Sequence, residues 1–332
     1  MRRLLVRSPR GLAPLCLLLA VLVALPARAN GLPELRVAVL AYGTVNWELE
    51  TIERLGFDRE NGFDLAVEGL GGTSAARIAF QGGAADAMVA DWLWVARQRA
   101  AGKDYVFVPY STAVGGLVVP GDSGAETLAD LAGGTVAIAG GPLDKSWLIL
   151  RAHAREAHGI DLAAETEAVY AAPPLLMQKA LAGEFDGAVN YWHYLARMEA
   201  GGMRPLVSVA EAAETLGLDP ETPLLGYVFK AGFVAENPGL VRGFALASRA
   251  AKDVLAEDDA AWEPLRPMMK PASEAEFAAL RAGFRAGIPA DFAVDRAGAA
   301  AFFALMRGLG GAELTGPAET LPEGIFLDPL AP

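Results

Sequence analysis

The fold is decided by a stretch that occurs twice in the chain, at residues 79–97 and again at residues 179–197. "AFQGGAADAMVADWLWVAR" aligns with "KALAGEFDGAVNYWHYLAR" without a gap. The identical pairs are Gly83/Gly183, Asp86/Asp186, Val89/Val189, Trp92/Trp192, Ala96/Ala196 and Arg97/Arg197. Self-similarity at a fixed period indicates repeated structural units, and this period is long enough for a lobe rather than a solenoid repeat.

The same offset extends upstream, where "VAVLAYGTVNWEL" from Val37 aligns with "AIAGGPLDKSWLI" from Ala137. Each copy alternates short apolar runs with segments of helical periodicity. The strand-length runs are "LRVAVL", "DAMVA", "TVAIA" and "DGAVN". Such alternation predicts an α/β fold in which each copy forms a mostly parallel sheet flanked by helices.

Two β-rich segments, Tyr105 to Gly134 and Leu224 to Leu240, follow the two copies and contain strands that leave one lobe and enter the other. The tail from Pro238 onward is mostly helical, and we expect it to return to the first lobe. Two lobes joined by two crossover strands make a hinged clamshell that closes around a ligand. The predicted boundaries are residues 1–29 for a signal peptide, 30–115 and 225–332 for lobe I, and 116–224 for lobe II.

The first 29 residues have the pattern of a secretory signal: four early arginines, the apolar stretch "LAPLCLLLAVLVALP" and a small-residue cleavage site at Ala27–Ala29. We therefore expect export and cleavage. Without this segment 23 basic and 40 acidic residues remain, a net charge of −17 that disfavours nucleic acid and anionic lipid as partners. Cys16, the single cysteine, lies in this segment, so the mature chain has no disulfide or cysteine metal site.

Candidate binding residues follow from the predicted topology, because ligands of open parallel sheets bind beyond the carboxyl ends of the strands, next to helix N-termini. Two facing lobes bring two such sets together. The positions that meet this rule are Tyr42 to Asn46, Gly72 to Ser74, Asp91–Trp92, Gly140 to Trp147 and Asn190 to His193.

A nucleotide-binding loop and an enzyme active site are both disfavoured by the sequence. At "GGPLDKS", Ala139 and Asp144 stand where a phosphate-binding loop requires glycine. His153 and His158 are five residues apart and do not share a helix face, and no serine nucleophile motif accompanies His193. We therefore expect no catalytic residue, no metal and no cofactor.

Three segments carry a family resemblance: "DLAGGTVAIAGG" from Asp130, "ALAGEFDGAVNYWHYLA" from Ala180 and "FKAGFVAENPGLVRGF" from Phe229. They resemble the periplasmic substrate-binding proteins of ABC importers for nitrate, sulfonates and taurine, a family that includes binders of thiamine-pyrimidine precursors. The resemblance implies a two-lobed clamshell of the periplasmic binding protein type, a small-molecule ligand in the cleft, and delivery to a membrane permease with its ATPase. It also implies a periplasmic location, and we expect a monomer.

The family's pocket, carried over by position, gives the predicted ligand contacts: Tyr42, Thr44, Thr73, Ser74, Asp91, Trp92, Lys145, Ser146, Asn190, Tyr191 and Trp192. The chain departs from the sulfonate pattern at "GGPLDKSW", where sulfonate binders often have a Gly-Ser-rich turn. Asp91 with Asp144 would suit a ligand that carries a cationic or hydrogen-bond-donating part. Two alternatives stay open: a periplasmic accessory or sensor protein, and a pyrimidine-synthase-like enzyme, although the cysteine-rich segment of those synthases is missing.

Overall fold

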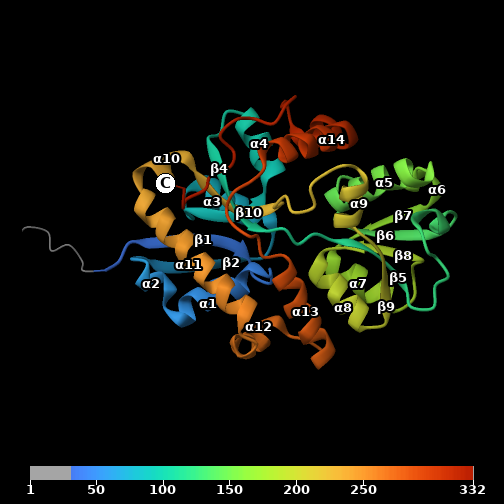
Figure 1. Ribbon diagram of the computed structural model, residues 1–332, viewed down its shortest axis with the longest axis horizontal. Coiled ribbons are helices and arrows are strands. Elements are labelled where there is room, and N and C mark those ends of the chain that lie inside the picture. The colour runs from blue at the N-terminus through green and yellow to red at the C-terminus, as the bar shows by residue number, and fades with distance from the viewer. Residues whose placement is uncertain (1–30, 332) are drawn as a thin grey trace, which may run out of the picture. The chain divides into compact units, whose positions relative to one another are not determined.

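The computed structural model describes residues 31–331 (Figure 1), and the predicted signal peptide at residues 1–29 lies outside them. Within this part of the chain no helix is both long and apolar enough to span a membrane. The strands are β1 Glu34–Leu40, β2 Asp64–Leu70, β3 Ala87–Asp91, β4 Tyr105–Ser111, β5 Gly116–Pro120, β6 Thr135–Ala139, β7 Glu167–Ala171, β8 Gly187–Asn190, β9 Met203–Ser208 and β10 Leu225–Lys230.

The α-helices are α1 Val45–Leu55, α2 Phe57–Glu60, α3 Thr73–Gly82, α4 Trp92–Ala100, α5 Lys145–His158, α6 Leu162–Glu165, α7 Pro173–Leu181, α8 Trp192–Ala200, α9 Val209–Thr215, α10 Ala231–Glu236, α11 Pro238–Glu257, α12 Arg266–Met269, α13 Glu274–Ala286 and α14 Arg296–Thr315. Two 3-10 helices, η1 Leu128–Leu131 and η2 Ala260–Leu265, connect them. Helix α14 has a kink at Gly311, whose φ is 59°.

The strands form two five-stranded sheets with the orders β2-β1-β3-β10-β4 and β7-β6-β8-β5-β9. We call the first sheet with its helices lobe I and the second lobe II. In each sheet one strand, β10 or β5, pairs antiparallel with both neighbours, so the other four run in the same direction. The prediction of mostly parallel sheets in two lobes is confirmed. The reversed strand is the one by which the chain enters that lobe from the other, and it therefore starts at the opposite end.

Residues at equivalent positions of the two repeat copies make equivalent contacts in the structure. Asp86 and Asp186 each accept a hydrogen bond from the backbone N–H of the first strand of their own copy of the repeat, at Arg36 (3.0 Å) and Thr135 (2.7 Å). These carboxylates fix the approach of the third strand to the first. The repeated aspartate is therefore a structural feature of both lobes.

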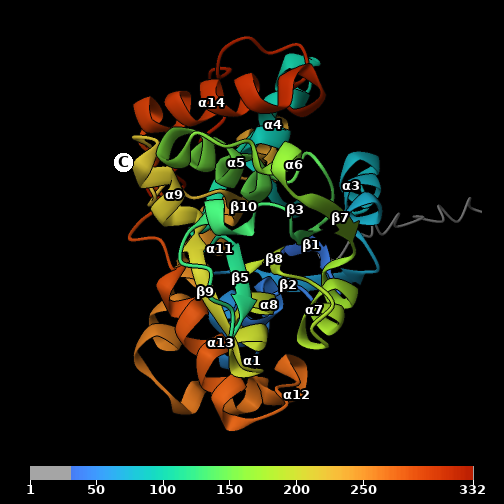
Figure 2. The same ribbon diagram turned by 90° about the vertical axis from the view of Figure 1, so that its right-hand side faces the viewer.

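The C-terminal helices pack on both lobes. Helix α11 packs on α1 and α2 of lobe I, as the sequence predicted for the tail. Helix α14 packs on α4 of lobe I and also on α5 of lobe II, and α13 packs on α8 of lobe II (Figure 2). The apolar side chains of α13, such as Phe284, lie in the core of lobe I. The tail thus makes contacts across the lobes that the sequence did not predict.

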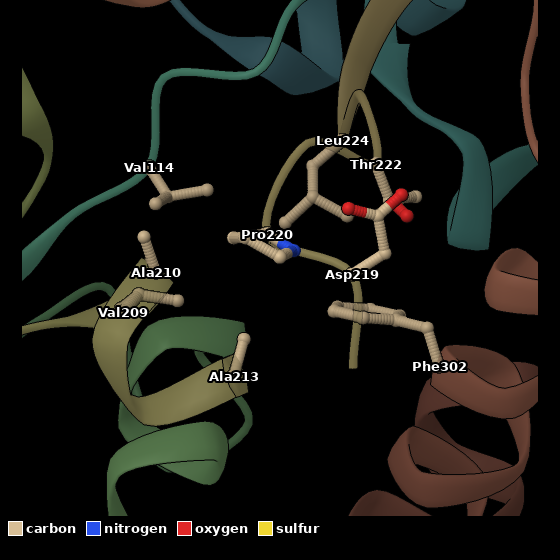
Figure 3. Close-up of a pocket in the computed structure, with 9 residues that line it drawn as sticks. All are labelled: Val114, Val209, Ala210, Ala213, Asp219, Pro220, Thr222, Leu224 and Phe302. Atoms are coloured by element: carbon tan, nitrogen blue, oxygen red, sulfur yellow. The ribbon is translucent and has the colours of Figure 1, made fainter. Parts of the chain in front are cut away.

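The chain crosses between the lobes twice, at residues 112–115 and again at residues 216–224. A small cavity lies at these crossings, and Figure 3 shows Val114 of the first, Leu224 of the second and Phe302 of α14 among the residues that line it. Its walls are mostly apolar, and the buried Thr222 hydroxyl has no hydrogen-bond partner among the described residues. None of the predicted ligand contacts lines this cavity.

Candidate functional site

The loop after β1 is held in one conformation by its own hydrogen bonds. The Asn46 side-chain amide donates to the carbonyl of Leu40 at 2.7 Å and to that of Gly43 at 2.8 Å. The Tyr42 hydroxyl donates to the carbonyl of Gly71 at 2.7 Å, which ties this loop to the loop after β2. Tyr42 is nevertheless 68% exposed, so its ring is available for contact with a ligand.

An ion pair joins the two lobes at the junctions expected to hold the site. Lys145 Nζ, at the start of α5 in lobe II, lies 3.1 Å from Asp91 Oδ2, at the end of β3 in lobe I. Asp91 Oδ1 also accepts from the backbone N–H of Trp94 at 2.9 Å and caps α4. Burial alone would raise the pKa of Asp91, but Lys145, the Trp94 N–H and Arg77 outweigh it and hold the pKa below its usual value.

A second carboxylate, Asp144, lies in lobe II next to Lys145. It caps α5 by accepting from the backbone N–H of Trp147 at 3.1 Å. Burial raises the pKa of Asp144, and the Trp147 N–H and Lys145 offset this only in part. Gly140 has a φ of +91°, and a Cβ there would lie 3.6 Å from the Tyr191 hydroxyl and 3.9 Å from Asp144 Oδ2. Burial and the nearby Asp144 raise the pKa of Tyr191 to about 12, so its hydroxyl stays a donor at neutral pH.

Ser146 and Asn190 lie against the first crossing segment. A Cβ on Gly115 would lie 2.2 Å from the carbonyl oxygen of Asn190 and 3.2 Å from Ser146 Oγ, so only glycine fits there. The Asn190 amide donates to the carbonyl of Pro173 at 3.1 Å, and its oxygen accepts from the N–H of Tyr191 at 2.9 Å. Asn190 is 1% exposed, and these hydrogen bonds order the strand end and the start of α7, while its predicted contact with a ligand stays a prediction.

The two equivalent tryptophans have different surroundings. Trp92 is 0% exposed and lies edge-on to Phe302 and Phe326, in the core under α14. Its side chain is therefore covered in this structure, and the ligand contact expected of Trp92 stays a prediction. Trp192 is partly exposed and lies edge-on to Trp47 of lobe I, with ring centroids 5.9 Å apart. Trp192 is thus a contact between the lobes.

The remaining predicted residues sit at helix starts. Thr44 is the N-cap of α1 and makes no capping hydrogen bond with its side chain. Thr73 and Ser74 are exposed in the first turn of α3, whose N-cap is Gly72. A glycine N-cap leaves the first N–H groups of α3 without a side-chain acceptor, as an anion- or polar-group-binding helix start requires.

Two residues that are not among the predicted ligand contacts belong to this region, although His193 lies in the stretch Asn190 to His193 that the sequence marked as a candidate position. The Arg77 guanidinium lies 5.1 Å from the centroid of the Trp94 ring and acts electrostatically on Asp91. Arg77 Nε has no hydrogen-bond partner among the described residues. His193, next to Tyr191, has its pKa lowered to about 4 by burial and then by Arg197, so it is neutral at pH 7. Arg77 follows Ser74 by one helical turn, a spacing that would have indicated a shared helix face.

The structure thus brings together, from lobe I, the capping aspartate and an arginine, and from lobe II a lysine, a second aspartate and a tyrosine. These residues are Asp91, Arg77, Lys145, Asp144 and Tyr191. Two cations and two carboxylates in a small region can bind a ligand that has both an anionic or polar group and hydrogen-bond donors. Within residues 31–331, no group of three or more His, Cys, Asp or Glu side chains has the arrangement of a metal site.

The fold is shared by solved binding proteins of low sequence identity. The Escherichia coli periplasmic aliphatic sulphonate binding protein SsuA is 18% identical, with a TM-score of 0.68 over 86% of this chain and 89% of that one. The alkanesulfonate-binding protein SsuA from Xanthomonas axonopodis pv. citri, bound to MOPS, is 17% identical, with a TM-score of 0.65 over 88% and 97% of the two chains. The Candida albicans CA3427 product, described as having the generic periplasmic binding protein fold, is 9% identical, with a TM-score of 0.57 over 84% and 90%. No curated protein matches the sequence significantly.

These findings define the chain as a protein of the two-lobed periplasmic binding protein fold. The model of the NMT1/THI5-like family matches residues 51–261, which is more than half of the sequence. The chain belongs to the NMT1/THI5-like family.

Proposed function

We propose that this protein is the periplasmic solute-binding component of an ABC importer, which captures a small polar or anionic organic ligand between its lobes and delivers it to a membrane permease. Its fold and family membership support this role. Two of the solved structures that share this fold are sulfonate-binding proteins. The proposal contains no catalytic step.

The ion pair between Lys145 and Asp91 carries this proposal. It places a cation of lobe II and a carboxylate of lobe I within 3.1 Å, at the helix starts of both lobes. A ligand held there makes contacts with both lobes at once, so its binding energy favours the closed arrangement. The Lys145 ammonium has three N–H donors, and Asp91 accepts one of them, which leaves donors for an anionic group of the ligand.

The chemistry of the neighbours narrows the ligand class. Arg77 adds a second cation beside Asp91, while Asp144 and the Tyr191 hydroxyl offer an acceptor and a donor. Tyr42 and Tyr191, which are 68% and 39% exposed, supply aromatic surface. A small molecule with an anionic or polar end and a hydrogen-bond-donating part satisfies all of these groups.

Export, lobe division and partners are parts of the same proposal. We propose cleavage after residue 29, a monomer in the periplasm, lobe I at residues 30–115 and 225–332, and lobe II at residues 116–224. The permease and its ATPase at the inner membrane would receive the ligand after the lobes open.

Thermal-shift screening of the purified protein against sulfonates, nitrate, amino acids, pyrimidines and small organic acids tests the proposal. A compound that binds only the folded state stabilises it by RT ln(1 + [L]/Kd), about 2.7 kcal/mol when its free concentration is a hundred times Kd, and this raises the melting temperature. We expect at least one class to raise the melting temperature of the wild type and to have little effect on Lys145→Met. Lys179→Met, an exposed lysine of lobe II paired with Glu184, should respond like the wild type. A panel without any stabilising compound would remove the support for solute binding.

A further inference from the structure

The indole of Trp192 packs against helix α13 at Gly283, a position that has no side chain. A Cβ added to Gly283 would lie 2.8 Å from two ring carbons of Trp192, Cε3 and Cζ3. The three atoms nearest to this Cβ all belong to Trp192. Real Cβ atoms do not approach other atoms so closely, so any side chain at Gly283 displaces the indole. The missing side chain of Gly283 is therefore what lets α8 of lobe II approach α13 at this distance.

The indole also meets the aromatic core of lobe I. Trp47 of α1 lies edge-on to Trp192, with ring centroids 5.9 Å apart and planes at 90°. Phe284, the residue after Gly283, lies 5.9 Å from Trp47 and 5.3 Å from Trp262. Edge-to-face packing of aromatic rings, as between Trp192 and Trp47, is favourable beyond the area that it buries. Trp192 is thus seated on lobe I through both α1 and α13.

A second contact lies further along α8, where Arg197 reaches the same group of helices. Its guanidinium forms an ion pair with Glu276 of α13 and donates to the carbonyl of Met269 at 2.7 Å. Two contacts on one helix fix both its position and its rotation. Helix α13, on which Trp192 packs, is also bonded to the first crossing between the lobes. The N–H of Thr112 in that crossing donates to the carbonyl of Gly287, just after α13, at 2.9 Å.

Both copies of the sequence repeat use the same two residue types to contact a C-terminal helix. Trp92 and Arg97, the equivalents of Trp192 and Arg197, face α14: Trp92 packs on Phe302 and Arg97 donates to the carbonyl of Glu313 at 3.2 Å. Each copy of the repeat therefore uses its tryptophan and arginine to hold one C-terminal helix. In lobe II the helix held, α13, is built into the core of lobe I, so the contact joins the lobes.

We propose that Trp192 and Gly283 are positioning residues that set the angle between the lobes for ligand capture. The inference rests on the proposed solute-binding function and gives Trp192 a role in closure instead of ligand contact. Trp192 directly follows Tyr191, whose hydroxyl lies beside Asp144. The seat of Trp192 on α13 therefore determines where Tyr191 and the start of α8 stand relative to lobe I.

Small-angle X-ray scattering of the ligand-free protein tests the contact between Trp192 and Gly283. Gly283→Leu should increase the radius of gyration, because overpacking at the contact shifts the closed-to-open ratio by about tenfold or more. Gly283→Ala, a smaller change at the same position, should give a smaller increase. The double variant Gly283→Leu/Trp192→Ala should return the radius toward the wild-type value, since removing the indole makes room for the leucine.

Gly308→Leu is the matched control, because Gly308 is also inside a C-terminal helix but has open space around its Cβ position. It should leave the radius of gyration unchanged. An unchanged radius in folded Gly283→Leu and Gly283→Ala, or the same increase with and without Trp192, would overturn the proposal. A failed ligand screen would not affect these measurements, so failure of the seat and failure of the proposed function are distinguishable.

Discussion

Lys145 Nζ of lobe II lies 3.1 Å from Asp91 Oδ2 of lobe I, and both residues stand at the first turn of a helix. The side chains are 32% and 15% exposed, so the pair is shielded from solvent to a large extent. The carboxylate is fixed independently by the N–H of Trp94. Asp91 therefore provides a rigid anchor on lobe I toward which the flexible lysine of lobe II reaches.

We expect Lys145→Met to lower the free energy of unfolding by about 1–3 kcal/mol, because it leaves a largely buried carboxylate without its cation. Lys179→Met should cost no more than about 1 kcal/mol, since Lys179 and Glu184 are 42% and 48% exposed and such surface pairs contribute little. Urea unfolding at pH 7 measures both. Equal losses in the two variants would mean that the pair between the lobes is no stronger than a surface pair.

The repeat made the topology predictable, because its shared residues perform the same local task in each lobe. Asp86 and Asp186 bind the first strand in both copies, and Gly83 and Gly183 both have positive φ, at 81° and 77°, where the preceding helix ends. Contacts that lie within one copy depend on one short stretch of sequence. A pattern comparison could therefore predict two similar sheets, whereas the order of their strands comes from the structure.

Removing the repeated carboxylate should destabilise both lobes, and lobe I more. Asp86 accepts from the backbone N–H of Arg36 and forms an ion pair with its side chain at 2.6 Å, whereas Asp186 accepts from the N–H of Thr135. We expect Asp186→Ala to cost about 1–3 kcal/mol for the lost acceptor, and Asp86→Ala to cost more. Chemical denaturation of each variant measures this, with the exposed Asp122→Ala as control. A loss no larger than that of Asp122→Ala would contradict the role assigned to the repeat.

The site was less predictable from the sequence. Equivalent residues of the two repeat copies contact different C-terminal helices, and these helices lie outside the repeat. Trp92 and Trp192 are equivalent in sequence, yet α14 covers the first and α13 seats the second. Which helix covers which copy depends on packing over more than a hundred residues of chain. The pairing of Lys145 with Asp91 is likewise a contact between lobes, and spacing along the chain carries no information about it.

A buried charge network under α1 gives a prediction about stability alone. Glu48 is 0% exposed and forms an ion pair with Lys252 while accepting from the hydroxyls of Tyr227 at 2.8 Å and Ser248 at 2.6 Å. Lys252→Met should cost about 3–5 kcal/mol, because an uncompensated carboxylate remains buried. The double variant Lys252→Met/Glu48→Gln should recover much of this loss, since glutamine is neutral and still accepts from the two hydroxyls. Urea unfolding of Lys252→Met, Glu48→Gln and the double variant measures these losses, and a double-variant loss equal to the sum of the two single losses would contradict the coupling.

His193 should make the protein less stable in mild acid. Burial, and then Arg197, lowers its pKa from 6.5 to about 4 in the folded state, so the unfolded chain binds the proton first as the pH falls. Its contribution to stability is complete above pH 6.5 and is lost between pH 6.5 and about 4, with a slope of at most about 1.4 kcal/mol per pH unit. His193→Gln should flatten the pH dependence of the melting temperature in this window. Tyr194→Phe, next along the helix, should retain the wild-type slope, and an unchanged slope in His193→Gln would refute the assignment.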